Sequence, residues 1–112
     1  MARNTLLEVP PYPVERALKQ LGNNLRTARI RRSLTIEQVA RKIGVGVRSI
    51  AAAEKGKPST GVAVYTALLW TYGLLNDFEM LADSSRDAVG QTLALSREGV
   101  RARRRKGLNN DF

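Results

Sequence analysis

Basic side chains crowd one stretch in the first half of the chain. Between residues 26 and 57, nine Lys or Arg residues stand against two carboxylates, Glu37 and Glu54. The nine are Arg26, Arg29, Arg31, Arg32, Arg41, Lys42, Arg48, Lys55 and Lys57. Guanidinium and ammonium groups supply positive charge and hydrogen-bond donors but no nucleophile, and their characteristic chemistry is the binding of phosphate. The sequence therefore predicts a surface that attracts a polyphosphate.

The composition of the whole chain excludes several other kinds of site. Its 112 residues contain 19 Lys or Arg and 10 Asp or Glu, for a net charge of +9, and neither Cys nor His. Zinc fingers, thiol nucleophiles, disulfides and His-based triads are thereby excluded. The carboxylates that follow residue 76 lack the spacing of a calcium loop. We expect one small domain that is not an enzyme and that uses no metal or cofactor.

The elements that must position the basic residues are predicted to be helices. Apolar residues recur at steps of three and four over 14–31, with Pro13 suited to a first turn, and this predicts a helix that Gly22 could divide. Several prolines precede it, so 1–13 is predicted to be a flexible, extended N-terminal arm.

Shorter helices are predicted to follow. Thr35 and Gln38 have the spacing of a capping box for a helix over 36–43. Gly44 and Gly46 allow a tight turn before the next helix. The remaining predicted helices cover 47–55, 62–72, 77–81 and 85–96. No segment alternates between apolar and polar residues, so the expected fold class is all-α.

Two short helices joined by a glycine turn are typical of a helix-turn-helix. The second helix of such a pair can enter the major groove of DNA, while helix N-termini and nearby lysines contact phosphates. An ordinary helical hairpin in a bundle would have the same spacing. The local positive charge favours DNA over that alternative.

Several motifs resemble those of the Cro/C1 (XRE) type helix-turn-helix repressors. They are Leu25-Arg26-Thr27-Ala28-Arg29, Leu34-Thr35-Ile36-Glu37-Gln38-Val39-Ala40, Gly44-Val45, Ile50 and Glu54-Lys55-Gly56-Lys57-Pro58-Ser59. The resemblance covers about 24–81 and implies a five-helix DNA-binding domain over 14–82. It also implies a homodimer that binds double-stranded DNA at a palindromic operator. Leu34, Val39, Ile43, Val45 and Ile50 would be core, and Arg29 would form a structural ion pair with Glu54.

The same resemblance assigns the DNA contacts. They would come from Arg41, Gly46, Val47, Arg48, Ser49, Ala52, Lys55 and Lys57. Arg48 is the side chain able to make a bidentate contact with guanine. Ile36 stands where the family often has a glutamine, and 51–53 is a run of alanines. Direct base readout is therefore expected to be thin, with larger contributions from the DNA backbone and DNA shape.

A narrower resemblance extends toward the C-terminus. The stretches 73–78, 81–83, 87–90 and 108–112 are similar to those of HipB-type antitoxins. This resemblance implies a HipA-type kinase toxin as partner, which the antitoxin neutralises while repressing their shared operon.

The last part of the chain is strongly basic. Residues 83–96 are predicted to add a helix, and 97–112 to form a flexible tail with six of the 19 basic residues. Leu108 and Phe112 are two apolar residues that could dock on a partner. The alternative is a solvated tail whose arginines add non-specific DNA contacts.

Other readings remain open at this stage. One is a stand-alone XRE-type regulator without a toxin, and a more distant one is a basic RNA-binding protein that stacks bases on aromatic rings. We expect Tyr65, Trp70 and Tyr72 to serve core packing or a dimer seam instead. The stretch 61–76 is too short and too polar to span a bilayer, and 1–9 lacks the apolar core of a secretory signal. The expected location is the cytoplasm, on the nucleoid through DNA binding, with no membrane partner.

Overall fold

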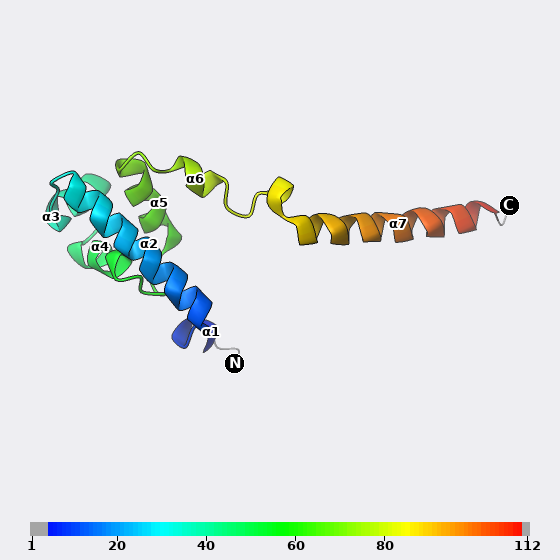
Figure 1. Cartoon of the computed structure of the whole chain (residues 1–112), viewed down its shortest axis with the longest axis horizontal. Helices are drawn as coiled ribbons and strands as arrows, with labels where there is room; N and C mark the ends of the chain where they lie inside the picture. The colour runs from blue at the N-terminus through cyan, green and yellow to red at the C-terminus, as the bar shows by residue number, and fades with distance from the viewer. Residues whose placement is uncertain (1–4, 111–112) are drawn as a thin grey trace. The chain divides into compact units, whose positions relative to one another are not determined.

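The chain folds into helices joined by short turns. The computed structural model describes the backbone of residues 5–110 and the side chains of residues 6–105. Its α-helices are α1 (Thr5–Glu8), α2 (Tyr12–Arg31), α3 (Ile36–Ile43), α4 (Val47–Glu54), α5 (Val62–Thr71), α6 (Asn76–Glu79) and α7 (Ala88–Asn110), with a 3-10 turn η1 (Ser84–Arg86) (Figure 1). No strand occurs in residues 5–110, so the predicted all-α class is confirmed. The chain divides into two compact units, 1–78 and 79–112.

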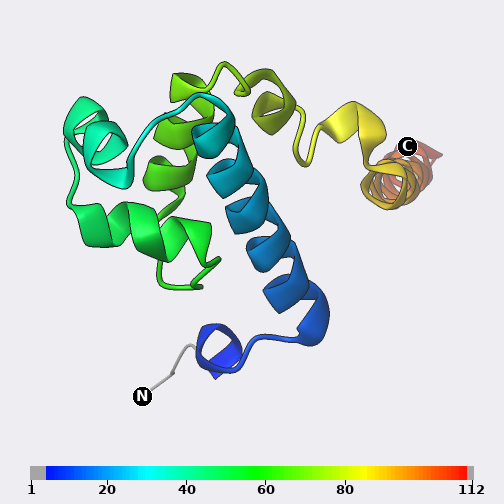
Figure 2. The same ribbon diagram turned by 60° about the vertical axis from the view of Figure 1, so that its left-hand side comes forward.

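In the first unit α2 to α5 enclose a small core. Figure 2 shows α3, α4 and α5 gathered beside the long helix α2. Leu25, Val39, Ile50 and Leu68, one from each of these four helices, are wholly buried. Leu34, Ile43 and Val45, which were also expected in the core, are half-buried and pack against it.

α2 is continuous and starts earlier than predicted. It begins at Tyr12, after Pro11, and Gly22 does not divide it. Gly22 is buried at a point where α2 meets the end of α4. A Cβ atom at this position would lie 2.6 Å from the carbonyl oxygens of both Ala53 and Glu54. The missing side chain thus lets two helix backbones approach closely, and that contact outweighs the low helix propensity of glycine.

The prediction of an extended arm over 1–13 is wrong for the residues that the structure describes. Thr5–Glu8 form the short helix α1, and Tyr12 and Pro13 already belong to α2. The segment 5–8 contains no proline, and Pro13 occupies the first turn of α2, where its missing N–H group costs nothing.

The turn between α3 and α4 has the predicted chemistry. The Thr35 hydroxyl accepts a hydrogen bond from the Gln38 amide at 3.1 Å, and the Gln38 side chain accepts one from the Thr35 amide at 2.9 Å. The capping box is confirmed. Gly44 ends α3 with a φ of 85°, a left-handed conformation that favours glycine.

In the second unit η1 precedes the long helix α7. The Asp87 carboxylate accepts a hydrogen bond from the Gly90 amide at 3.0 Å at the start of this helix. The predicted helix end at Ser96 is wrong, because α7 continues to Asn110. Residues 97–106 are mostly Arg, Ala and Lys, which have high helix propensity, and they contain no proline. The side chain of Leu108 and the whole of Phe112 lie outside the described residues.

Candidate nucleic-acid interface

The two helices of the candidate interface begin in different ways. α3 starts at Thr35, whose side chain accepts one of the first amide hydrogens. α4 starts at Gly46, which has no side chain to accept its amides. The first N–H groups of a helix point along its axis, at the positive end of the helix dipole. In α4 the Ser49 amide already donates to the Gly46 carbonyl oxygen at 3.1 Å, so the Val47 and Arg48 amides are the ones available to a phosphate.

The outer face of α4 carries the predicted base-reading residues. Val47 is 44% exposed, Arg48 is exposed, and Ser49 and Ala52 are half-buried. Arg48 is the long polar side chain among these four, and its guanidinium can donate two parallel hydrogen bonds to guanine. The Val47 side chain offers an apolar contact of the kind that recognises the thymine methyl group. This short α4 face can read few base edges.

The predicted phosphate-binding side chains flank this face. Arg41 lies in the last turn of α3. Lys55 is the residue that caps the C-terminus of α4, and Lys57 follows two positions later. All three side chains are exposed, so their charges face solvent. The interface therefore combines a narrow reading surface with cations before and after it along the chain.

Arg29 and Glu54 form the ion pair that the family resemblance implies. Arg29 Nε lies 2.7 Å from Glu54 Oε2 and Nη2 lies 3.0 Å from Oε1, while Nη1 donates to the Leu34 carbonyl oxygen at 2.9 Å. The side chains are only 11% and 6% exposed. The hydrogen bond to Glu54 raises the pKa of Arg29 above its ordinary value. This pair links α2 to α4 and to the start of α3, and it neutralises the Glu54 charge within the basic region.

Arg32 has a structural role that the sequence pattern did not indicate. Its Nη1 donates to the Ala28 carbonyl at 2.9 Å and its Nη2 to the Tyr72 carbonyl at 2.8 Å. Its guanidinium carbon also lies 5.5 Å from the centroid of the Tyr72 ring. Arg32 thus holds the ends of α2 and α5 together. Its position just past a helix end was the available signal, because arginines there often bind the last carbonyls.

The aromatic residues divide between the core and the surface. Tyr65 and Tyr72 are buried, as expected. Trp70 is 66% exposed and lies outside the core. A platform for single-stranded nucleic acid stacks successive bases on several exposed rings. On α5 only Trp70 is an exposed ring, and the basic residues of the candidate interface lie on α3 and α4. The helix α5 therefore does not form such a stacking platform.

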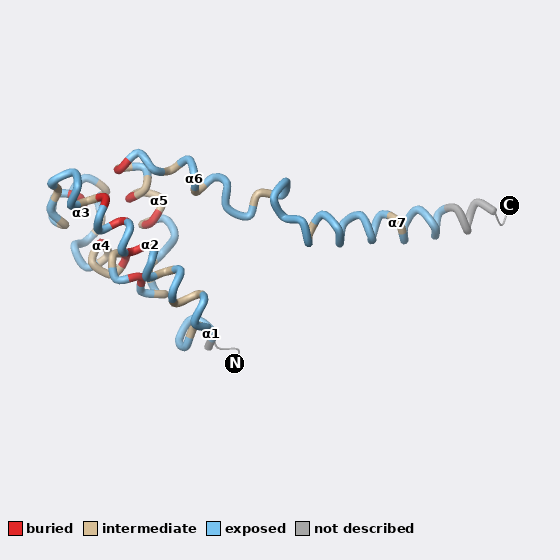
Figure 3. The backbone as a smooth tube through the Cα atoms, in the orientation of Figure 1, coloured by how far each residue is buried: buried red, intermediate tan, exposed pale blue. Residues whose placement is uncertain are grey.

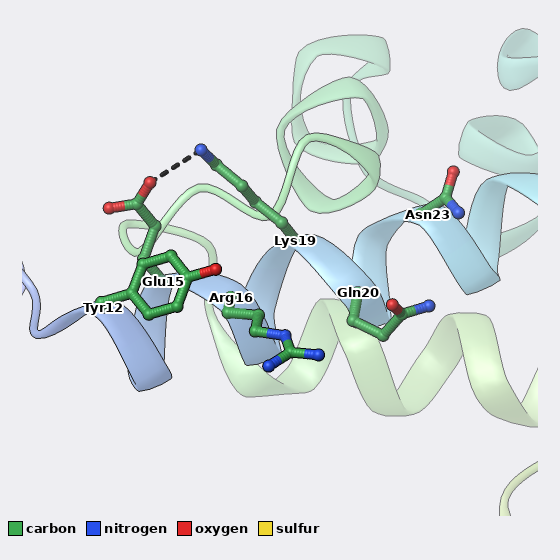
Figure 4. Close-up of a pocket in the computed structure, with 6 residues that line it drawn as sticks. All are labelled: Tyr12, Glu15, Arg16, Lys19, Gln20 and Asn23. Carbon is green, nitrogen blue, oxygen red and sulfur yellow. Dashed lines mark hydrogen bonds and ion pairs between the residues drawn. The ribbon is translucent and has the colours of Figure 1, made fainter.

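Figure 4 shows a shallow pocket of about 380 Å³ along one face of α2. Its lining residues are Tyr12, Glu15, Arg16, Lys19, Gln20 and Asn23. They all come from one helix, and the charges of Glu15 and Lys19 pair with each other at 2.7 Å. Such a surface does not enclose a ligand.

The described residues offer neither a metal site nor a membrane-spanning helix. Nowhere in the described part of the chain do three acidic side chains gather where they could hold a metal ion. Among the described helices, none combines the length and apolar character that crossing a membrane requires.

Comparison with known protein families identifies a helix-turn-helix domain. A family described as a helix-turn-helix domain matches residues 20–79. This range contains all eight predicted DNA-contact residues and both members of the Arg29–Glu54 pair. No curated protein and no solved structure matches the chain.

Proposed function

The chain belongs to the helix-turn-helix domain family, and on that premise we propose that it represses its own operon as a dimer and neutralises a HipA-type kinase toxin. The coarser part of this statement, a DNA-binding regulator, follows from the family. The observation that carries the DNA-binding part of the proposal is the outer face of α4. There an exposed Arg48 and Val47 stand beside an uncapped helix start, with exposed cations before and after the helix.

In the proposed mode of binding, α4 enters the major groove. Arg48 donates to a guanine edge, and Val47 contacts a thymine methyl group. The first amides of α4, with Arg41, Lys55 and Lys57, bind phosphates and fix the position of the domain on the duplex. Ala52 contributes only a methyl group, so DNA shape and backbone contacts supply a large share of the specificity.

The proposed dimer matches the two-fold symmetry of a palindromic operator, whose half-sites lie about 34 Å apart. Exposed apolar side chains near the end of α5 support it. Trp70 is 66% exposed and Leu74, just beyond the helix, is 46% exposed. Apolar surface of this kind is a common mark of a protein interface. A second copy of the chain would cover it.

The antitoxin part of the proposal is supported by the resemblance of 73–78, 81–83 and 87–90 to HipB-type antitoxins. The toxin would dock on the antitoxin and act with it as a co-repressor, and Leu108 and Phe112 are the proposed anchors of the C-terminal segment. We propose no catalytic activity for this chain itself. We propose that it is located in the cytoplasm, on the nucleoid.

DNA binding is tested by gel shift on the DNA upstream of the gene. Arg48→Ala is expected to cost about 1–3 kcal/mol and to relax the preference at one base pair. The matched control is Lys55→Ala, which removes a phosphate contact and is expected to weaken all sequences alike. If the wild-type chain did not shift the upstream DNA at low salt, alone or with its partner, the repressor proposal would be wrong. If Arg48→Ala left affinity and footprint unchanged, the assignment of α4 as reading helix would be wrong.

The toxin partnership is tested by co-expression with the neighbouring gene product and size-exclusion chromatography. The expected result is one complex whose formation requires the segment after Ser96. If a chain ending at Ser96 still bound the partner, Leu108 and Phe112 would not be part of the docking surface. The absence of any complex with a kinase-like neighbour would leave a stand-alone regulator of the XRE type.

A further inference from the structure

The C-terminal half of α7 carries a dense cationic surface that the proposed function does not use. We call residues 97–105 the arginine segment. It contains five arginines, at positions 97, 101, 103, 104 and 105, and one carboxylate, Glu98. All five arginine side chains are exposed, and Figure 3 draws most of the described length of α7 as exposed. No carboxylate among the described side chains forms an ion pair with them.

Helix geometry gathers four of these cations on one face. Arg97, Arg101, Arg104 and Arg105 have the spacing i, i+4, i+7 and i+8, which places them along one side of an α-helix. Like charges at this spacing repel each other and destabilise an isolated helix. An array of negative charges beside the helix would attract all four arginines and offset the repulsion between them.

Duplex DNA supplies such an array. The arginine segment rises about 12 Å along the helix axis, and duplex DNA carries one phosphate charge per about 1.7 Å of its own axis. About seven phosphate charges therefore fall within the length of the segment. Every described cation in the segment is an arginine, whose planar guanidinium binds phosphate through two parallel hydrogen bonds.

We propose that the arginine segment of α7 is a second DNA-binding element, which holds backbone phosphates of duplex DNA outside the contacts made by α4. This inference rests on the proposed function, because the helix-turn-helix brings the chain to DNA. Once one element of a chain is bound, the second binds at a high effective concentration, so even a weak phosphate contact adds to the total affinity.

The composition of α7 favours DNA over a membrane surface. A helix that lies in a membrane interface has an apolar face, often with Trp or Phe, opposite its basic residues. Among the described side chains of α7, the exposed large apolar residues are Val89, Leu93, Leu95 and Val100, most of them before the arginine segment. No aromatic residue occurs between 88 and 110.

The salt dependence of DNA binding tests the proposal. The full chain is titrated onto a short duplex of random sequence from about 50 to about 200 mM salt. The variant R101Q/R104Q removes two charges from the arginine face. Each lost phosphate contact reduces the slope of log K against log salt by about 0.9, so this slope is expected to become shallower by about 1.8. The matched control R16Q/K19Q removes two exposed charges from α2 and is expected to keep the wild-type slope.

The outcomes separate this inference from the proposed function. Failure of the wild-type chain to bind duplex DNA at low salt would overturn both. Wild-type binding that is sensitive to Arg48→Ala, together with an unchanged slope for R101Q/R104Q, would overturn only the inference. An equal loss of slope in both double variants would also overturn it, because overall charge would then explain the effect. Circular dichroism of each variant confirms that the helices are retained.

Discussion

At the scale of single residues, Glu54 shows how a negative charge is tolerated inside the basic region of the candidate interface. Its carboxylate is 6% exposed and is bound by Arg29 through two hydrogen bonds. Glu54→Ala leaves the Arg29 charge buried without its partner, and this is expected to lower the free energy of unfolding by about 3–5 kcal/mol. Urea denaturation measures the change. Glu37→Ala, at an exposed position on α3, is the control and is expected to change stability by less than about 0.5 kcal/mol. Equal effects of the two substitutions would contradict a structural role for the pair.

Tyr72 presents a different problem, a buried hydroxyl that has no hydrogen-bond partner among the described residues. Burial raises the pKa of Tyr72 above 10.0, with Glu54 as the next cause. The unfolded chain therefore loses the phenol proton first as pH rises. The stability that comes from the neutral phenol is complete below about pH 10 and is lost as pH climbs through the raised pKa of the folded state.

Tyr72→Phe is accordingly expected to be neutral or slightly stabilising at pH 7, because it removes an unsatisfied polar group. Above pH 10 it is expected to lose less stability than the wild-type chain. Thermal unfolding at several pH values measures both effects, and absorbance of the tyrosinate follows the titration directly. A steeper alkaline loss in the Phe variant would be inconsistent with the buried phenol.

At the scale of elements, the contact between α2 and α4 is made by backbone. Gly22→Ala would place a methyl group 2.6 Å from the carbonyl oxygens of Ala53 and Glu54, so the two helices must separate. We expect a loss of about 1–3 kcal/mol or more in the free energy of unfolding. Gly99→Ala on α7 is the control, because a Cβ atom there meets nothing within 4 Å. DNA affinity of the Gly22 variant should fall as well, since α4 is displaced. Retained stability and affinity would show that the close approach is unimportant.

The elements differ in how well the sequence predicts them. Thr35, Gln38 and Gly44 act through neighbours three or four residues away, so the start and end of α3 follow from local chemistry. The role of Gly22 depends on Ala53 and Glu54, which are more than thirty residues away in the sequence. From the sequence of its own helix, Gly22 predicts only a local loss of helix stability. The C-terminal end of α7 was mispredicted because a charge run was read as a solvated tail, while its arginines also favour helix.

At the scale of the whole molecule, the proposed dimer uses the exposed apolar surface near the end of α5. Trp70→Ser replaces an exposed apolar ring, and the dissociation constant of the proposed dimer is expected to rise at least about tenfold. Analytical ultracentrifugation measures the equilibrium, and operator affinity should weaken in parallel. Tyr12→Ser, which changes another exposed aromatic residue at 72% exposure, is the control. If the Trp70 variant kept the dimer dissociation constant of the wild-type chain, the interface would lie on another surface.

The sequence predicts the total charge of the molecule, but it does not predict the role of every basic residue. The nine cations of 26–57 together predicted a surface for nucleic acid, and the family resemblance set Arg29 apart as the partner of Glu54. The structure contains that pair, and it adds Arg32, which holds helix ends together through backbone carbonyls. Arg32 and Arg48 are both exposed residues, so only the hydrogen-bond partners of Arg32 reveal its structural role. The candidate site was therefore predictable as a place on α3 and α4, and so was the pairing of Arg29, but the role of Arg32 was not.

The division of α4 into two faces also bears on how this chain could acquire new targets. Ile50 and Ala53 are fully buried and fasten the helix to the core, whereas Val47 and Arg48 are exposed on its outer side. Substitutions at the two outer positions leave the packed face intact, since surface changes usually alter stability by less than about 0.5 kcal/mol. In the proposed mode of binding, DNA preference can thus change during evolution, or be exchanged by design, while the scaffold stays the same.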